Sequence, residues 1–388
     1  MVALQREAVT QAVTVREQTR TRFAYIDNLR IYLTLLVIFH HAAIAYGGAG
    51  DWGIQDRVTD AISPIVLSIF NGINQAYFMA TFFLLAGYFT PAALARKGAQ
   101  SFLTDRLIRL GIPLLVYTTL ILNLNGYLID RFYLGRTYQV RIDYEPGHLW
   151  FLQALLIFAV VYVLMQGVSG NNRGAVSQAA TRPFPVDRTL WGWIAILALL
   201  TFAVRIVSPV GVWTWGLQLG HFVHYIFAFS VGSIAYHHDW FAQLPPVQAR
   251  RWGIGVLLGI PAFVLVALLS GVLDDSTAMS RMMGGLHWEA LLYALWESFF
   301  LVAAMIFLIH LFRTRFNQAG SWLSFLAANV YTVYIIHQTI LYGVNIGLLG
   351  VDLPSIIKFF VAAAITIPVC FLLSALIRRL PGATRVLG

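Results

Sequence analysis

Long apolar stretches, separated by short polar segments, follow one another along almost the whole chain. A helix needs about 20 apolar residues to cross the hydrocarbon core of a bilayer. Stretches of that kind recur ten times, so the pattern predicts an all-α protein with about ten transmembrane helices. The second and ninth are less uniformly apolar than the others. The predicted spans are residues 31–48, 74–94, 107–129, 149–168, 190–208, 217–236, 253–272, 290–311, 323–344 and 355–377.

The polar segments between these spans are too short to form a separate soluble domain. We therefore predict a polar cytoplasmic arm over residues 1–24, a single transmembrane domain over residues 25–380, and a cytoplasmic tail over residues 381–388. The first apolar run follows the polar arm and is long enough to span the membrane. For that reason we expect no cleavable signal peptide.

Composition and charge agree with a membrane protein. Of the 388 residues, 59% are hydrophobic and only 11% are charged, whereas soluble domains carry about 25% charged residues. Lys and Arg are concentrated in alternate connections, and this predicts that both termini lie in the cytoplasm. The net charge of +9 is thus spread over many loops. A nucleic-acid-binding protein would instead need one concentrated basic face, so we expect no nucleic-acid partner.

Cysteine and histidine spacing gives little sign of disulfide or metal chemistry. Cys370 is the only cysteine, so no intramolecular disulfide can form, and its apolar surroundings favour a role in packing. His221 and His224 have a spacing that can hold a metal ion, but no carboxylate or cysteine lies between them. We therefore expect no metal cofactor.

The first predicted span contains charged and titratable residues in the stretch "FAYIDNLRIYLTLLVIFHHAAIAYG". Asp27 and Arg30 precede the apolar run, and His40 and His41 lie inside it. A helix rises 1.5 Å and turns 100° per residue, so Arg30 and His41 share one face about 16 Å apart, with His40 about 80° away. Ionisable groups in a membrane are costly and are usually functional. The alternative is that His41 only hydrogen-bonds a neighbouring helix.

Basic residues also precede the third span. Arg106 and Arg109 in "DRLIR" are three residues apart, so they face the same way on a helix. Together with Arg30 they could form a cytoplasmic cluster that binds phosphates through paired hydrogen bonds. An ordinary positive flank, with Asp105 paired to a neighbour, explains them equally well.

Four further polar residues are candidates for the site. His337 in "YIIHQ" lies deep in the ninth span, where a catalytic histidine and a packed one are both consistent with the sequence. Glu297 in "ALWESFF" could orient an imidazole or a substrate hydroxyl, or pair with Arg205. His148 begins the fourth span, where it could contact an acceptor or belong to an aromatic belt. His148 and Arg205 are the candidates for binding an acceptor.

Several stretches resemble the membrane acyltransferase family 3, in particular its glucan-succinylating branch. "IDNLR" with ten residues between Arg30 and His41 is similar to the first-span motif of the family. "FFLLAGYFTPAALARKG", "FLTDRLIRLGIPLL", "GHLWFLQALLIF" and "VYTVYIIHQTIL" follow in the family's order, over residues 23–345 in all. One departure concerns Ala86-Gly87, where the family often has Ser-Gly, so a hydroxyl role at that point is in doubt.

The resemblance implies transfer of an acyl group, such as acetyl or succinyl, from cytoplasmic acyl-coenzyme A to a hydroxyl, usually of a sugar beyond the outer face. It also implies a bacterial inner-membrane location. A hydroxyl is a weak nucleophile and needs a base, and His41 has the side chain suited to that role. The family match favours coenzyme binding by Arg30, Arg106 and Arg109.

Other roles and functions stay open at this point. His337 and Glu297 are the additional catalytic candidates, and Asp27 and His40 are candidates for supporting the site. A secondary transporter would need discontinuous spans and more acidic residues near the middle of the membrane, which the sequence does not show clearly. A lipid- or glycan-binding membrane protein without catalysis would tolerate the loss of His41. The acyl group, the acceptor, its side of entry and the oligomeric state are not determined by the sequence.

Overall fold

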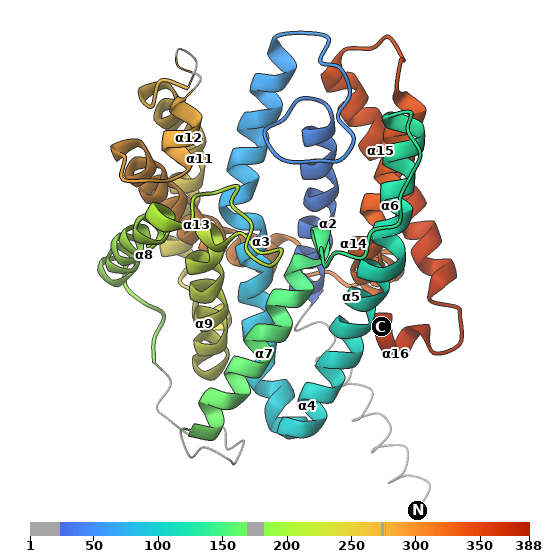
Figure 1. Ribbon diagram of the computed structural model, residues 1–388. Helices are drawn as coiled ribbons and strands as arrows, with labels where there is room; N and C mark the ends of the chain where they lie inside the picture. The colour runs from blue at the N-terminus through green and yellow to red at the C-terminus, as the bar shows by residue number, and fades with distance from the viewer. Residues whose placement is uncertain (1–23, 169–181, 273–274, 276) are drawn as a thin grey trace, which may run out of the picture.

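The computed structural model describes residues 24–168, 182–272, 275 and 277–388 (Figure 1). These residues form helices and no strands, as the sequence predicts, whereas the predicted arm lies almost entirely outside them. The long helices are α2 (Ala24–Ala45), α3 (Ile62–Lys97), α7 (Trp150–Val168), α8 (Asp187–Val207), α9 (Phe222–His238), α11 (Pro246–Leu269), α13 (Trp288–Arg315), α14 (Ser321–Leu348) and α15 (Ser355–Ile377).

The third predicted span belongs to a helical stretch over Ala99–Tyr133 whose winding changes repeatedly. It consists of α4 (Ala99–Arg106), α5 (Ile112–Val116) and α6 (Leu122–Leu128), each followed by a π-helical turn. The π turns are η1 (Leu107–Gly111), η2 (Tyr117–Ile121) and η3 (Ile129–Tyr133). Short π-helical turns are rare and are often found at functional sites. Shorter helices elsewhere are α10 (Trp240–Gln243), α12 (Ala278–Met283) and α16 (Ala383–Leu387), with 3₁₀ turns η4 (Gly147–Leu149) and η5 (Leu219–His221).

Nine of the described helical stretches are long and apolar enough to cross a membrane, and they correspond to nine of the ten predicted spans. The remaining predicted span, 323–344, lies in α14, whose 28 residues give it ample length but whose composition is more polar. The polar side chains of α14 include Asn329, His337, Gln338 and Asn345, and all four are buried in the protein. They lower the apolar character of the helix while facing its neighbours instead of lipid.

The start of the second span differs from the prediction. α3 begins at Ile62, twelve residues before the predicted boundary at residue 74. The carboxylate of Asp60 accepts hydrogen bonds from the backbone amides of Ile62 (3.0 Å) and Ser63 (2.7 Å), which satisfies two amides that lack partners within the helix. The hydroxyl of Ser63 also donates to this carboxylate. These hydrogen bonds lower the pKa of Asp60.

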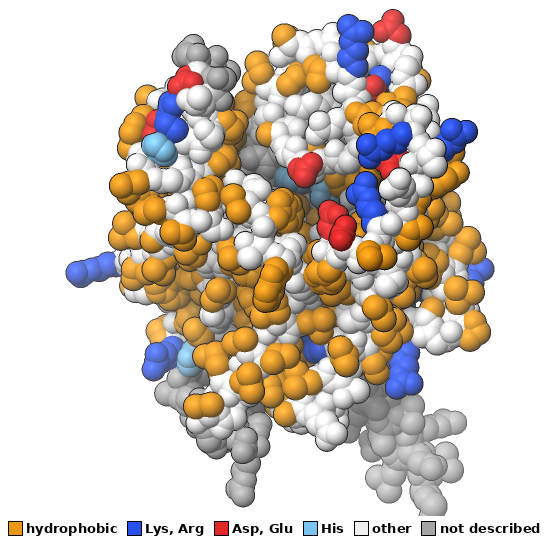
Figure 2. Space-filling view, viewed as in Figure 1, with side chains coloured by type: hydrophobic (Ala, Val, Ile, Leu, Met, Phe, Trp, Pro, Cys, Tyr) orange, Lys and Arg blue, Asp and Glu red, His pale blue; other side chains and the backbone are white. Residues whose placement is uncertain are grey.

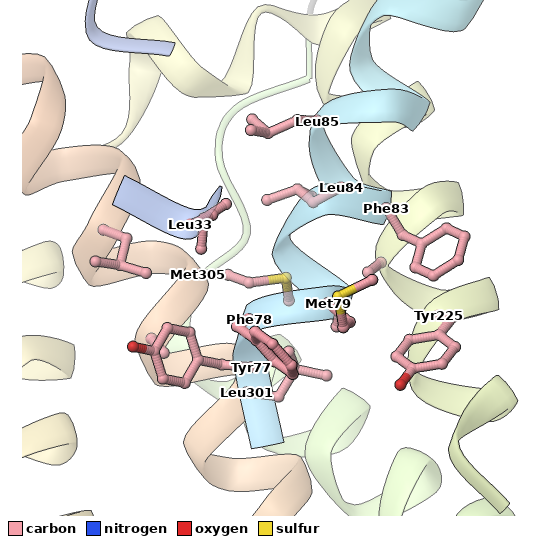
Figure 3. Packing of buried hydrophobic residues seen from close by; sticks show 14 of the residues in the cluster. Leu33, Tyr77, Phe78, Met79, Phe83, Leu84, Leu85, Tyr225, Leu301 and Met305 are labelled. Carbon is pink, nitrogen blue, oxygen red and sulfur yellow. The ribbon is translucent and has the colours of Figure 1, made fainter. Parts of the chain in front are cut away.

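The central helices of the bundle are α2 and α3. In Figure 1, α8, α9, α11, α12 and α13 lie on one side of them, and α6, α14 and α15 on the other. α2 packs against α3, α13, α14 and α15, and most of its residues are buried. Figure 3 shows part of the core, in which Leu33 of α2, Phe83 of α3, Tyr225 of α9 and Met305 of α13 belong to one cluster. Because α2 is surrounded by these helices, most of its side chains lie inside the bundle.

Charge is distributed unevenly over the outside of the bundle. In Figure 2, hydrophobic side chains cover the middle of the viewed face, whereas its acidic side chains gather in the upper part. The connection between α2 and α3 lies at this upper end in Figure 1, and α4 lies at the lower end. Lys and Arg side chains are visible in both the upper and the lower part of this face, so the acidic side chains alone distinguish its upper part.

Close packing of α3 against α9 leads to a testable prediction about stability. A Cβ atom on Gly87 would lie 2.1 Å from the carbonyl oxygen of Phe229, so even alanine does not fit without movement of the helices. We expect Gly87→Ala to destabilise the protein by about 1–3 kcal/mol, the usual cost of overpacking. Thermal unfolding in detergent should show a lower midpoint. Gly192→Ala, on α8 with open space around it, is the control and should keep the midpoint or raise it slightly, because alanine favours a helix more than glycine does. An equal midpoint for both variants would contradict this prediction.

Candidate active site

Two histidines from distant parts of the chain form a hydrogen-bonded pair. Nδ1 of His41 on α2 lies 2.8 Å from Nε2 of His337 on α14. The two ring planes differ by only 9°, so the two imidazoles are nearly parallel. His337 is fully buried, whereas His41 is partly exposed. The structure therefore brings together two of the predicted catalytic residues, and only His41 retains some exposed surface.

The partners of the pair determine which nitrogen of each neutral ring carries a hydrogen. Nδ1 of His337 lies 2.6 Å from the carbonyl oxygen of Tyr334, which can only accept, so this nitrogen must be the donor. Nε2 of His337 then accepts, and Nδ1 of His41 donates to it. This assignment leaves a lone pair on Nε2 of His41. His41 is thus arranged to receive a proton on the nitrogen that faces away from His337.

A third imidazole lies against this pair. The ring of His148 is 4.7 Å from that of His337 in an edge-to-face arrangement. Nε2 of His148 is within hydrogen-bond distance of the carbonyl oxygens of Tyr334 (3.1 Å) and Ile335 (3.0 Å), and the hydroxyl of Tyr334 donates to the carbonyl oxygen of His148. His148 is therefore buried against α14, and its role in acceptor binding stays a prediction.

Gln338 connects His148 to residues that the sequence analysis did not select. Its Oε1 lies 2.7 Å from Nδ1 of His148 and accepts from the hydroxyl of Tyr117 (2.5 Å), while its Nε2 donates to the hydroxyl of Tyr342 (3.1 Å). Tyr117 belongs to the π turn η2. The polar residues at positions 337, 338 and 342 were the available signal, because these positions lie on neighbouring faces of one helix.

Trp52 is a further residue that the sequence analysis missed. It lies in the connection between α2 and α3, and its indole stacks on the ring of His41 at a centroid distance of 4.6 Å and an angle of 18°. His40 has a different environment, because it is buried and stacks on Phe78 at 4.9 Å. The two adjacent histidines therefore have different surroundings, in agreement with their predicted separation around the helix.

The predicted basic cluster lies at the end of α2 opposite to Trp52. Arg30 is exposed and lies 3.7 Å from Asp27, its predicted supporting residue. The charges of Arg30 and Arg109 both act on Arg106, whose guanidinium lies over the ring of Phe102 at 5.0 Å. Nε of Arg109 is 3.3 Å from Asp105. The three arginines are thus near one another, with a carboxylate beside each outer member.

α14 links this basic cluster to the imidazole pair. The hydroxyl of Tyr331 on α14 donates to the backbone carbonyl oxygen of Arg109, and His337 follows six residues later, a rise of about 9 Å along the helix. An open polar cavity of about 490 Å³ lies beside Arg109. Sites for small ligands typically occupy about 300–1,000 Å³, so this space is large enough for a small ligand. Its lining includes Gln100, Ser101, Thr104, Asp105, Ile108, Arg109 and Arg385.

Glu297 and Arg205 meet in a second buried polar cluster. Nη2 of Arg205 lies 2.6 Å from Oε2 of Glu297, and both side chains are at most 1% exposed. Nδ1 of His221 is 3.4 Å from the same carboxylate, and Nε2 of His224 lies 3.0 Å from the hydroxyl of Ser298. Glu297 therefore lies beside two imidazoles, but neither belongs to the His41 pair. A catalytic role for Glu297 and an acceptor-binding role for Arg205 stay predictions.

Potential metal ligands do not gather in the described part of the chain. In residues 24–168, 182–272, 275 and 277–388, no group of three His, Cys, Asp or Glu residues is placed to hold a metal ion. The cluster around Glu297 is instead neutralised by Arg205, which occupies the place beside the carboxylate that a cation would need.

A sequence model of the family described as an acyltransferase domain matches residues 23–375 of the chain. The chain belongs to this family. The resemblance to the membrane acyltransferase family 3 is therefore confirmed, and it extends to nearly all the described helices. No solved structure matches the chain.

Curated relatives within the acyltransferase family carry the name glucans biosynthesis protein C. The protein of that name from Escherichia coli K12 is 27% identical over 150 residues, or 36% of this chain and 37% of the relative. The one from Salmonella paratyphi B is 28% identical over 261 residues, or 62% of this chain and 65% of the relative. The alignments thus span between about a third and two thirds of the length of these relatives.

Proposed function

We propose that this member of the acyltransferase family is a membrane O-acyltransferase that moves an acyl group from acyl-coenzyme A to a carbohydrate hydroxyl. The observation that carries the proposal is the His41–His337 pair, because it leaves a lone pair on Nε2 of the partly exposed His41, which can act as a base. The basic cluster at one end of α2 supports an anionic donor. The acyl group we propose is acetyl or succinyl, as the resemblance implies.

The proposed chemistry begins with proton transfer to His41. Nε2 of His41 takes the proton of the acceptor hydroxyl while the hydroxyl oxygen attacks the thioester carbonyl carbon. The tetrahedral intermediate then collapses, so that the carbon–sulfur bond breaks and the thiolate leaves. The imidazolium returns its proton to the sulfur, which yields an ester and free coenzyme A thiol.

His337 is proposed to hold His41 in place and to stabilise the imidazolium form. When His41 is charged, its Nδ1–H donates a charge-assisted hydrogen bond to Nε2 of His337, which is stronger than the bond between neutral rings. The other nitrogen of His337 is committed to the carbonyl oxygen of Tyr334, so His337 does not pass the proton further. This role parallels that of the carboxylate that orients histidine in hydrolase triads.

The donor is proposed to bind through Arg30, Arg106 and Arg109. Guanidinium groups form paired hydrogen bonds with phosphate oxygens, and coenzyme A carries several phosphates. The axial distance from Arg30 to His41 is about 16 Å, which a long flexible thioester arm can cross. With this end in the cytoplasm, as the basic residues favour, the protein would lie in the bacterial inner membrane and take its donor from the cytoplasm.

The names of the curated relatives support a carbohydrate acceptor. Both relatives described above are named for glucan biosynthesis, and a glucan offers many hydroxyl groups. His148 lies next to the imidazole pair and is the nearer of the two predicted acceptor contacts. Its nitrogens are occupied by Gln338 and by backbone carbonyl groups, so we propose that it shapes the acceptor pocket together with α14.

Reconstituted protein offers a direct test of the proposed function. Purified protein in liposomes, supplied with acetyl- or succinyl-coenzyme A and an oligoglucan, should release thiol in step with ester formation. A thiol reagent can follow the reaction because the one cysteine, Cys370, is fully buried. Mass spectrometry of the glucan should show the acyl mass added. Glucan or acyl-donor uptake without thiol release would favour a transporter, and binding without either would favour a non-catalytic protein.

The basic cluster leads to a prediction about donor affinity. Arg106→Gln should raise the KM for acyl-coenzyme A about tenfold or more, because a hydrogen bond to a charged group contributes about 1.5–3 kcal/mol and each 1.4 kcal/mol is a factor of about ten. The value of kcat should change little. Arg141→Gln, an exposed arginine in the loop before α7, is the matched control and should behave as the unmodified protein. A fall in kcat with an unchanged KM would argue against donor binding by Arg106.

A further inference from the structure

The connection between α2 and α3 contains a buried tryptophan above the proposed base. Residues 48–61, called the Trp52 segment below, leave α2 shortly after His41 and return to α3 at Ile62. Trp52 is only 7% exposed although it lies outside any helix. Its indole covers one face of the His41 ring at a centroid distance of 4.6 Å. Burial of so large a side chain in a connection requires a dedicated pocket.

That pocket is provided by α14, the same helix that carries His337. The ring of Tyr342 lies 4.8 Å from the indole of Trp52, and its hydroxyl accepts a hydrogen bond from the backbone amide of Gly53 at 3.3 Å. With its carboxamide turned to satisfy both neighbours, the oxygen of Asn345 accepts from Nε1 of Trp52 at 3.3 Å. A Cβ atom at Gly53 would lie 2.8 Å from the Tyr342 hydroxyl, so this close approach requires glycine.

A buried ion pair fastens the Trp52 segment to α15. Nζ of Lys358 lies 2.5 Å from Oδ2 of Asp56, and both side chains are less than a tenth exposed. The backbone carbonyl oxygen of Gln55 also accepts from the hydroxyl of Tyr133 at 2.7 Å. Opening of the segment at this point would separate Asp56 from Lys358 and leave the buried ammonium group without its partner. This cost disfavours opening. The segment is therefore held on the C-terminal side of Trp52.

We propose that Trp52 is a positioning residue that fixes the plane of the His41 imidazole and keeps water away from it. A single hydrogen bond from Nδ1 to His337 sets one atom of the ring but permits tilting about that bond. The indole, nearly parallel to the imidazole, removes this freedom and keeps the two imidazole rings nearly parallel. It also covers one face of the imidazole and so excludes water from that face. This inference rests on the proposed role of His41 as the base.

The consequence concerns the fate of the acyl group. If water replaces the acceptor hydroxyl, the base takes a proton from water, the hydroxide oxygen attacks the thioester carbonyl, and the products are a free carboxylic acid and coenzyme A thiol. An enzyme that transfers its acyl group must suppress this hydrolysis, and covering the base is one way to do so. Trp52 thus affects the ratio of transfer to hydrolysis as well as the rate.

The experiment compares Trp52→Ala with Trp52→Phe in the reconstituted assay. Thiol release measures all donor consumed, and mass spectrometry of the glucan measures transfer, so the difference gives hydrolysis. We expect Trp52→Ala to lower kcat for transfer at least tenfold, to leave the donor KM within about twofold, and to raise the hydrolysed share several-fold. Trp52→Phe, which keeps an aromatic ring over His41, should restore most of the transfer and the original ratio. Trp215→Ala, at an 85% exposed tryptophan, is the matched control and should change neither quantity.

Two further variants complete the test, and the first keeps the inference falsifiable if Trp52→Ala fails to fold. Lys358→Met leaves the carboxylate of Asp56 buried without its partner, which favours opening of the Trp52 segment, and it should also raise the hydrolysed share. His41→Ala combined with Trp52→Ala should abolish the added hydrolysis, because the base is then absent. An unchanged ratio of transfer to hydrolysis in both Trp52→Ala and the ion-pair variant would overturn the inference. Activity retained by His41→Ala alone would instead overturn the proposed base, so the two failures are distinguishable.

Discussion

Replacing His41 with alanine is expected to lower the rate of acyl transfer by about 10²–10⁴-fold, the usual contribution of a general base. The physical reason is that His41 is the partly exposed member of the imidazole pair, and its Nε2 is the nitrogen that can accept the acceptor's proton. The measurement is kcat for thiol release and ester formation in the reconstituted assay. Donor binding should persist, because the basic cluster is unchanged.

The matched control for this variant is His40→Ala. His40 is a neighbour in sequence, has the same side chain and is also within α2, but it stacks on Phe78 and has no part in the hydrogen bond to His337. It should retain transfer within a few-fold. Loss of activity in His40→Ala with activity retained in His41→Ala would show that the base is the other imidazole. Loss of transfer in both variants, with normal donor affinity, would show that both adjacent histidines, His40 and His41, are required.

Removing the carboxylate of Glu297 is expected to have the largest effect on stability. Glu297→Ala leaves the guanidinium of Arg205 buried without its partner, and breaking a buried ion pair in this way costs about 3–5 kcal/mol. The hydrogen bonds from Arg205 Nε to Gly220 (3.0 Å) and from Nη2 towards His221 (3.3 Å) cannot replace the lost charge. Thermal unfolding in detergent should show a clearly lower midpoint.

The control for the ion pair is the double variant Arg205→Met with Glu297→Leu. Replacing both charges by apolar side chains removes the uncompensated charge, so stability should return towards that of the unmodified protein. If the double variant is also fully active, the pair has a structural role. If Glu297→Ala unfolds normally but loses transfer, the carboxylate has the catalytic role that the sequence analysis considered.

The relative positions of residues within one helix could be predicted from the sequence, because helix geometry is fixed. The shared face of Arg30 and His41, and the different direction of His40, follow from 100° and 1.5 Å per residue, and the structure gives the two histidines separate surroundings. Nine of the ten spans were equally predictable, since a membrane requires long apolar helices. The ordered motifs also indicated the acyltransferase family, which the family model confirms.

Contacts between residues on different helices could not be predicted in this way. His41 and His337 are separated by 296 residues, and nothing in their local sequences states that α2 and α14 pack together. The sequence identified both residues as candidates but not as a pair. Glu297 was assigned alternative partners for the same reason, and only the packing of α13 against α8 places Arg205 beside it.

The sequence by itself determined the helical membrane class, the family, and the spacing of charge and imidazole along α2. The tertiary structure alone decided which imidazole pairs with His41, which nitrogen stays available for a proton, and that Trp52 covers the ring. The physical reason is that apolar length and helical period are properties of a single segment. Contacts between segments depend instead on how whole helices pack, and even a residue in a connecting loop can then become part of the site.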